Sequence, residues 1–168
     1  MHPRLTALAT IIGMTMGVLF IAASTFSRTS PRLIYNPSDS APRGFYLVAP
    51  PVQVHVGDYV IAQLPAAAAE VAAQRGYLPR SVPVLKQIAA AGGQFVCVRN
   101  GTVFIDAIAV ADVLDRDGRH RSMHAWDQCR RLAEREVFLL NLASPASFDS
   151  RYFGPVDISF LRGRATKW

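Results

Sequence analysis

An uncharged run from Leu5 to Ser24 is the feature that most limits what this chain can fold into. At a rise of about 1.5 Å per residue, a helix of this length spans roughly 30 Å, the hydrocarbon thickness of a bilayer. We therefore predict a single N-terminal transmembrane helix, with residues 1–27 as an anchor and residues 28–168 as a separate domain. A signal-peptide cleavage site at Ala22-Ala23-Ser24 is the alternative, but the uncharged run is longer than the apolar core typical of such peptides.

The orientation of the chain is not set by the charges that flank this run, because basic residues occur on both sides of it. A short tail ahead of a large C-terminal domain predicts that the domain is exported. Cys97 and Cys129, the only two cysteines, fit this expectation. A bridge between them would close a loop of about 32 residues and stabilise the fold by about 3–4 kcal/mol. Two unrelated buried thiols are the alternative.

The basic residues are scattered along the chain despite a net charge of +6. No lysine- or arginine-rich block occurs, so we expect no nucleic-acid partner. Of the 18 basic residues, Lys86 and Lys167 alone are lysines, and the other 16 are arginines. Since arginine stays charged in proteins while a buried lysine can become neutral, a lysine at an apolar internal position indicates a need for a removable proton.

The remaining pattern predicts a mainly β fold with one short inserted helix. Short apolar runs bounded by turn residues predict strands, and Asn100-Gly101 predicts a hairpin turn between two of them. The helix is expected from Ala66 to Arg75, ending at Gly76. Residues 112–131 are polar and irregular and predict a long surface loop. The predicted strands are Tyr46–Val48, Asp58–Ala62, Val84–Ile88, Phe95–Val98, Thr102–Ile105, Val137–Leu140 and a closing strand through Val156, Ile158 and Phe160.

No cofactor or metal site is predicted. Asp115 to Gly118 resembles part of a calcium loop, but Trp126 stands where the bidentate acid would be needed. His120 and His124 have helical spacing without a third ligand, and neither cysteine belongs to a CxxC pair.

The stretch from Asn36 to Tyr46 carries two serines between two prolines, shortly after the apolar run. Serines in such turns usually only bond to nearby backbone. A serine nucleophile needs a base, which is a histidine or a neutral lysine. The histidines lie in polar segments, whereas Lys86 lies between two aliphatic residues on one face of a predicted strand. We therefore predict Ser40 as the nucleophile and Lys86 as the general base.

Three further residues are expected to support this pair, and all lie in the stretch that follows the buried strand ending at Leu140. Ser147 is expected to orient Lys86, while Asp149 and Arg151 are expected to pair and brace the loop. Ser38 and the backbone N–H of Ser40 are predicted to donate to the oxyanion.

These residues fall in four segments that together resemble the type I signal peptidases, in the form of the conjugative-transfer peptidases of the TraF type. The resemblance covers nearly the whole chain and keeps the family's order. The segments are Ser38–Tyr46 (SDSAPRGFY), Leu85–Gly93 (LKQIAAAGG), Asn100–Asp106 (NGTVFID) and Ser147–Val156 (SFDSRYFGPV). The sequence departs from the family at Gln87 and Gln94, in and after the segment of the base, and keeps Ser40 and Lys86.

The resemblance implies a membrane-anchored serine endopeptidase with a Ser/Lys dyad on a signal-peptidase-like β fold. It implies a single-pass protein of the bacterial inner membrane, with its catalytic domain in the periplasm. Its partners would be the lipid bilayer and a precursor with small residues before the cut, and the protein is expected to be a monomer. The TraF-type form further implies maturation of a conjugative pilin, with possible joining of its ends.

Two other functions compete with this interpretation. The first is a non-catalytic exported β domain that scaffolds a conjugation or secretion complex, which leaves the lysine in an apolar strand unexplained. The second is a self-cleaving regulator with a Ser-Lys β fold, which would need a DNA-binding segment where the apolar run stands.

Overall fold

The computed structural model describes residues 11–18, 33–38, 41–51 and 53–168. The chain divides into two compact units, Met1–Ser30 and Pro31–Trp168. In the first unit, residues 11–18 form a helix. Within the described residues, no helix is long and apolar enough to cross a membrane. Most of the predicted span, Leu5–Ser24, lies outside the described residues, so the anchor and its boundary at residue 27 stay predictions.

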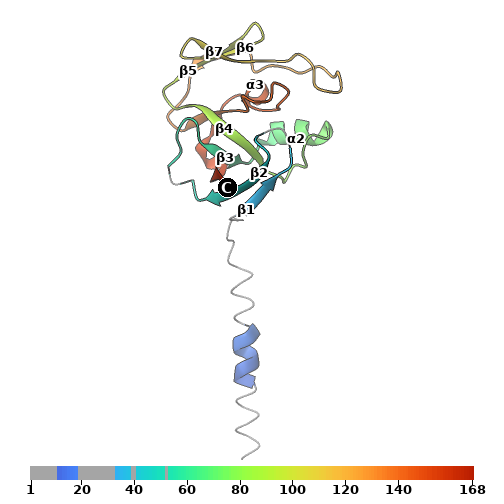
Figure 1. The fold of residues 1–168 in the computed structure, drawn as a ribbon, viewed down its shortest axis with the longest axis vertical. Coiled ribbons are helices and arrows are strands. Elements are labelled where there is room, and N and C mark those ends of the chain that lie inside the picture. The colour runs from blue at the N-terminus through green and yellow to red at the C-terminus, as the bar shows by residue number, and fades with distance from the viewer. Residues whose placement is uncertain (1–10, 19–32, 39–40, 52) are drawn as a thin grey trace, which may run out of the picture. The chain divides into compact units, whose positions relative to one another are not determined.

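The second unit is mainly β, as predicted, and is built on two antiparallel sheets (Figure 1). The larger sheet has seven strands in the order β1-β2-β11-β3-β4-β9-β10, so the last long strand lies in the middle of the sheet. The strands of this sheet are β1 (Leu33–Asn36), β2 (Gly44–Ala49), β3 (Tyr59–Ala62), β4 (Val84–Ala91), β9 (Glu136–Leu140), β10 (Val156–Asp157) and β11 (Leu161–Lys167).

The smaller sheet has four strands in the order β7-β6-β5-β8. Its strands are β5 (Phe95–Arg99), β6 (Thr102–Ile105), β7 (Ile108–Asp112) and β8 (Cys129–Arg131). The predicted hairpin turn is confirmed: Asn100 and Gly101 both have positive φ, at 50° and 74°, as the tight turn between β5 and β6 requires. Cys97 and Cys129 are paired across β5 and β8 and form the predicted disulfide.

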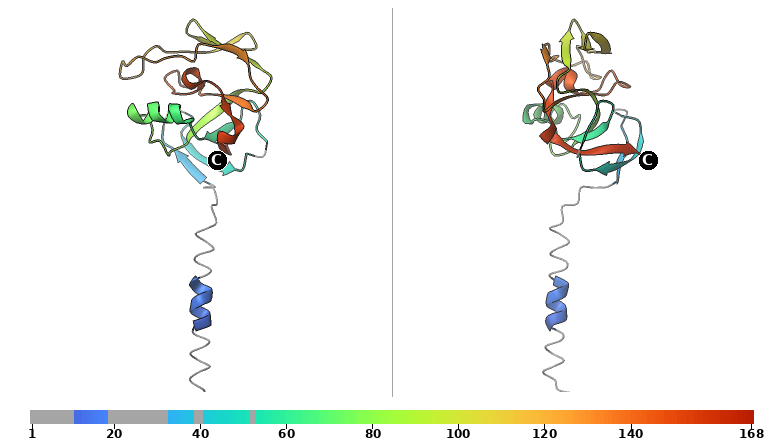
Figure 2. Two further views of the ribbon diagram at one scale, coloured as in Figure 1. Left: turned by 180° about the vertical axis from the view of Figure 1, so that it is seen from behind. Right: turned by 90° about the vertical axis from the view of Figure 1, so that its left-hand side faces the viewer.

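Short helical segments lie between strands of this unit. The predicted inserted helix is α2 (Ala66–Gln74), which ends just before Gly76 with φ 67°. Two helical segments were not predicted, α3 (Ser150–Phe153) and the 3₁₀ helix η1 (Ile158–Phe160). The loop from β7 to β8 extends over the side of the unit that carries α2 (Figures 1 and 2).

The predicted closing strand through Val156, Ile158 and Phe160 is wrong. Strand β10 stops at Asp157, whose carboxylate accepts the backbone N–H of Ser159 at 2.8 Å and caps η1. The closing strand is β11, which begins only at Leu161.

The core surrounds β3, β4 and β9 on both sides. One cluster packs Val60 and Ile88 beneath Val137 and Leu139. A cluster on the opposite side joins Tyr46, Ile61, Leu85 and Ala165. The disulfide-linked sheet packs on β9 through further aliphatic residues around Phe138 and Leu140. Strand β4, which carries Lys86, contributes a buried residue to each of these three clusters: Leu85, Ile88 and Ala90.

Candidate active site

Lys86 is the third residue of β4, where it is buried and paired with Val60 of β3. Only 3% of the residue is exposed. Burial lowers the pKa of Lys86 to about 8, because removing water penalises the ammonium form. The Asp149 carboxylate acts in the opposite sense and the Arg151 guanidinium acts with burial. A lysine in this setting can give up its proton near neutral pH.

Ser147 is the direct hydrogen-bond partner of Lys86: the Lys86 Nζ group donates to Ser147 Oγ. Ser147 is itself buried, and it lies 61 residues further along the chain. This hydrogen bond fixes the direction of the Lys86 amine. When the amine is neutral, its lone pair points away from Ser147. The sequence-predicted pair of Ser147 and Lys86 is thus brought together.

Asp149 and Arg151 form a fully buried ion pair below this contact. Arg151 Nε and Nη2 donate to the two Asp149 oxygens at 2.9 and 2.8 Å, a bidentate arrangement. Arg151 is 1% exposed and Asp149 0%. Arg151 also donates to the carbonyl oxygens of four residues, which lie in the loop before Ser147 and at the end of β7: Asp112, Asn141, Ser144 and Pro145. The pair therefore holds the backbone that carries Ser147.

Residue Ser40, the predicted nucleophile, lies outside the described residues, and the structure describes the chain on both sides of it. The buried Asn36 side chain donates to the carbonyl oxygens of Ser38 at 3.0 Å and Ala41 at 2.9 Å. Ser38 Oγ donates back to Asn36 Oδ1 at 2.9 Å. Tyr46, also buried, donates its hydroxyl to Pro42 O at 2.6 Å. One asparagine and one tyrosine thus fix both ends of the segment that contains Ser40.

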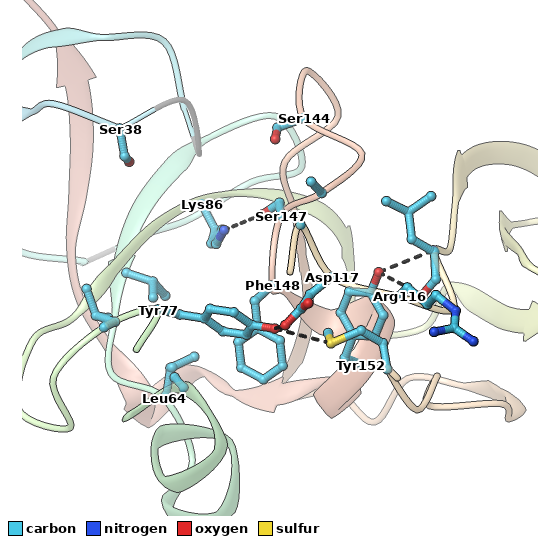
Figure 3. Close-up of a pocket in the computed structure, with 17 residues that line it drawn as sticks. Ser38, Leu64, Tyr77, Lys86, Arg116, Asp117, Ser144, Ser147, Phe148 and Tyr152 are labelled. Carbon is cyan, nitrogen blue, oxygen red and sulfur yellow. Dashed lines mark hydrogen bonds between the residues drawn. The ribbon is translucent and has the colours of Figure 1, made fainter. Parts of the chain in front are cut away.

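A cavity of about 370 Å³ opens beside these groups and is lined by Ser38, Lys86 and Ser147 together (Figure 3). Phe148, Tyr152 and Tyr77 form much of the rest of its wall. The cavity can therefore receive a polypeptide segment next to the buried lysine. His55, His120 and His124 are exposed and do not line it. Among the described residues, no group of three side chains could hold a metal ion.

A family model described as signal peptidase, peptidase S26, matches residues 5–168 of this sequence. The chain belongs to the signal peptidase S26 family. Membership supports a serine peptidase that removes signal peptides. Among solved structures, a signal peptidase I from Enterococcus faecalis V583 matches with a TM-score of 0.42 and 18% identity, over 68% of this chain and 97% of that chain. A comparison with curated protein sequences found no significant match. The assignment rests on the family model, since the structural likeness is distant.

Some residues of this peptidase site were missed in the sequence. Asn36 stands just before a proline and two residues before a serine, a typical turn-forming pattern that could have indicated its role. The Tyr152 hydroxyl accepts the backbone N–H of Leu114 and donates to its carbonyl oxygen, both at 3.2 Å. That contact joins residues 38 apart, so no local pattern could have indicated it.

Proposed function

We propose that this peptidase cleaves its precursor with a dyad of Ser40 and Lys86. The observation that carries the proposal is the buried Lys86, with its lowered pKa and its hydrogen bond to Ser147, in a cavity that Ser38 also lines. Neutral Lys86 takes the proton of the Ser40 hydroxyl as the oxygen attacks the scissile carbonyl. The resulting ammonium then donates the proton to the leaving amine, and water releases the acyl group by the same route.

The oxyanion needs hydrogen-bond donors, and we propose the Ser40 backbone N–H and the Ser38 hydroxyl for this role. In the structure the Ser38 hydroxyl donates to Asn36 Oδ1. Rotation about the Cα–Cβ bond of Ser38 must therefore bring it to the oxyanion when substrate binds. Ser147 keeps Lys86 aimed, and Asp149 with Arg151 keeps Ser147 in place.

The lipid bilayer is the surface on which we propose that the enzyme works. Five large apolar residues on β1, β2 and the C-terminus are each 46–79% exposed: Leu33, Tyr35, Phe45, Leu47 and Trp168. Tyr35 and Phe45 are cross-strand partners with ring centroids 5.0 Å apart, and Trp168 lies 6.4 Å from Phe45. The β11 residues Arg162, Arg164 and Lys167 are exposed nearby on the same sheet. Aromatic residues with a basic rim suit the interface of an anionic membrane.

Fluorescence can test this membrane contact, because the chain has only two tryptophans. In the Trp126→Phe variant, reconstituted in phosphatidylglycerol vesicles, brominated lipid should quench Trp168. In the matched Trp168→Phe variant, the remaining Trp126 packs on Phe138 in the core and should not be quenched. Equal quenching of both, or of neither, would argue against contact of this face with the bilayer.

The precursor that we propose is a conjugative pilin with small residues before the cut, supported by the TraF-type motifs of the sequence. We further propose an uncleaved anchor in the inner membrane, a periplasmic catalytic domain and a monomeric enzyme. The Ser40→Ala and Lys86→Ala variants should each accumulate uncut precursor in cells, and the mass of that precursor identifies the substrate. The matched control is Ser81→Ala, an exposed serine that does not line the cavity. Normal processing of the precursor in cells that carry either site variant would contradict the dyad and would favour a non-catalytic scaffold instead.

A further inference from the structure

The cavity beside Lys86 is larger than the family's preference for small residues requires. About 370 Å³ falls within the range of pockets that hold whole ligands, roughly 300–1,000 Å³. An alanine methyl group would leave most of it unfilled. The far part of the cavity must therefore receive something larger than the small residue at the cut.

The walls of this far part are apolar and aromatic. Leu64, Ala72 and Leu78 line it from α2 and its flanking segments, and Leu114 and Met123 from the loop between β7 and β8. Phe148 also lines it: its ring stacks on Tyr152 with centroids 5.9 Å apart, and it packs at a tilt against Tyr77 at 5.5 Å. Figure 3 shows Tyr77, Phe148 and Tyr152 turned toward the same space. Such a surface favours an apolar side chain.

The two walls are joined by a clamp centred on Asp117. Its Oδ2 accepts the Tyr77 hydroxyl at 2.5 Å and Arg121 Nε at 2.8 Å. Arg121 also donates to Arg75 O at 3.0 Å, and Arg75 donates to Ser122 O at 2.7 Å. The end of α2 and the loop are thereby held together across 40 or more residues of sequence. The Asp117 carboxylate is bonded to Tyr77 and Arg121 of the clamp. It therefore stabilises the wall of the cavity and does not make the cavity acidic.

Charges at the edge of the cavity are mainly positive. Lys86 lies at one end, and Arg116 lines the wall and donates to His120 O at 3.0 Å. The two arginines of the clamp outnumber its single carboxylate. A cationic side chain would lose its water in this surrounding without gaining a partner.

We propose that this cavity is a second recognition pocket that takes a bulky apolar side chain of the precursor, and that Asp117 is the positioning residue that holds its wall. The inference rests on the proposed peptidase function and adds a substrate requirement to it. The enzyme selects a small residue at the cleavage site and a large apolar residue at a second, nearby position. Lysine binds poorly at that second position.

The test uses the full chain in detergent and a set of fluorescent peptides with alanines at the cut, in which each flanking position in turn carries Ala, Phe or Lys. At one position the wild-type kcat/KM should be about tenfold or more higher for Phe than for Ala, the range that a pocket gives for added apolar groups. Binding of the same peptides to Ser40→Ala, measured by fluorescence anisotropy, should show the same order. Lys should bind most weakly there.

Variants of the clamp separate positioning from general damage. Asp117→Ala should reduce the Phe preference to threefold or less, and the loss should appear as a rise in KM for the Phe peptide. Tyr77→Phe, which keeps the ring and loses one hydrogen bond, should fall between. Asp115→Ala is the matched control, because this exposed neighbour does not line the cavity and should keep the preference.

The outcomes distinguish this inference from the proposed function. Cleavage without preference for Phe at any position would overturn the pocket and leave the peptidase standing. Preferential binding of Phe peptides to Ser40→Ala, with no cleavage by the wild type, would support the pocket and overturn the proposed dyad. A preference that survives Asp117→Ala would overturn the role of the clamp.

Discussion

Raising the pH from 7 to 9 should speed cleavage, because Lys86 must lose its proton before it can act. With a pKa of about 8, Lys86 is neutral in roughly one molecule in eleven at pH 7 and in about ten of eleven at pH 9. We therefore expect about a tenfold rise in kcat/KM over this range, with a slope of one in log(kcat/KM) against pH at low pH. A lysine with its ordinary pKa of 10.5 would be neutral about 300-fold less often at pH 7.

The assay measures initial rates on a peptide without ionisable side chains, so that the profile reports the enzyme alone. Asp149→Asn provides a second test. The Asp149 carboxylate raises the pKa of Lys86, so its removal should shift the rise in kcat/KM to lower pH. A flat profile between pH 6.5 and 9 would refute the reasoning. So would a rise centred near pH 6.5 that disappears when one of the three exposed histidines is replaced, since histidine would then be the base.

Three other perturbations follow from the same contacts. Lys86→Met should stabilise the fold at pH 7 by up to about 3 kcal/mol. The lowered pKa of Lys86 means that burial of its charged form destabilises the folded state below pH 8. The gain in stability should therefore shrink as the pH rises from 8 to 10.5. Asp149→Asn should destabilise by about 3–5 kcal/mol, because it leaves Arg151 buried without its counter-charge, and adding Arg151→Met should recover part of the loss. Cys97→Ser with Cys129→Ser should lower the free energy of unfolding by about 3–4 kcal/mol.

Urea unfolding of the detergent-solubilised full chain measures these three changes in the free energy of unfolding. A different result would contradict each prediction. A loss of stability in Lys86→Met at pH 7 would mean that the lysine is well solvated or firmly paired. A harmless Asp149→Asn would mean that water reaches Arg151. For the cysteines, a reductant should lower the stability of the wild type to that of the double variant and leave the variant unchanged. An equal effect on both proteins would mean that the loss of stability does not come from the disulfide.

Sequence reasoning worked where the chemistry depends on one strand or one short segment. The period of two in Val84–Ile88 was enough to place Lys86 among aliphatic residues, and the structure shows it buried there. Asp149 and Arg151, only two residues apart, were expected to pair and do so. In both cases the decisive neighbours are close in sequence.

Prediction failed where distant segments decide the conformation. Strand β11 was missed because the residues it turns inward include Gly163 and Ala165, which are too small to give an apolar alternation. The alternation of Ile158 and Phe160 suggested a strand instead, until the Asp157 cap turned that segment into η1. The Asp117 clamp joins α2 to a loop some forty residues later, and nothing in either segment alone indicates it.

The most direct test of the central claim is the intact mass of the enzyme after acid quenching during turnover of a good peptide substrate. The wild type should carry the acyl fragment on Ser40 and release it with time. Lys86→Arg should gain no mass and release no product, because guanidinium cannot take the serine proton, while Lys167→Arg, with the same change at an exposed position, should behave as the wild type. An acyl group on any other residue, or acylation of Lys86→Arg at the wild-type rate, would contradict the Ser40–Lys86 mechanism.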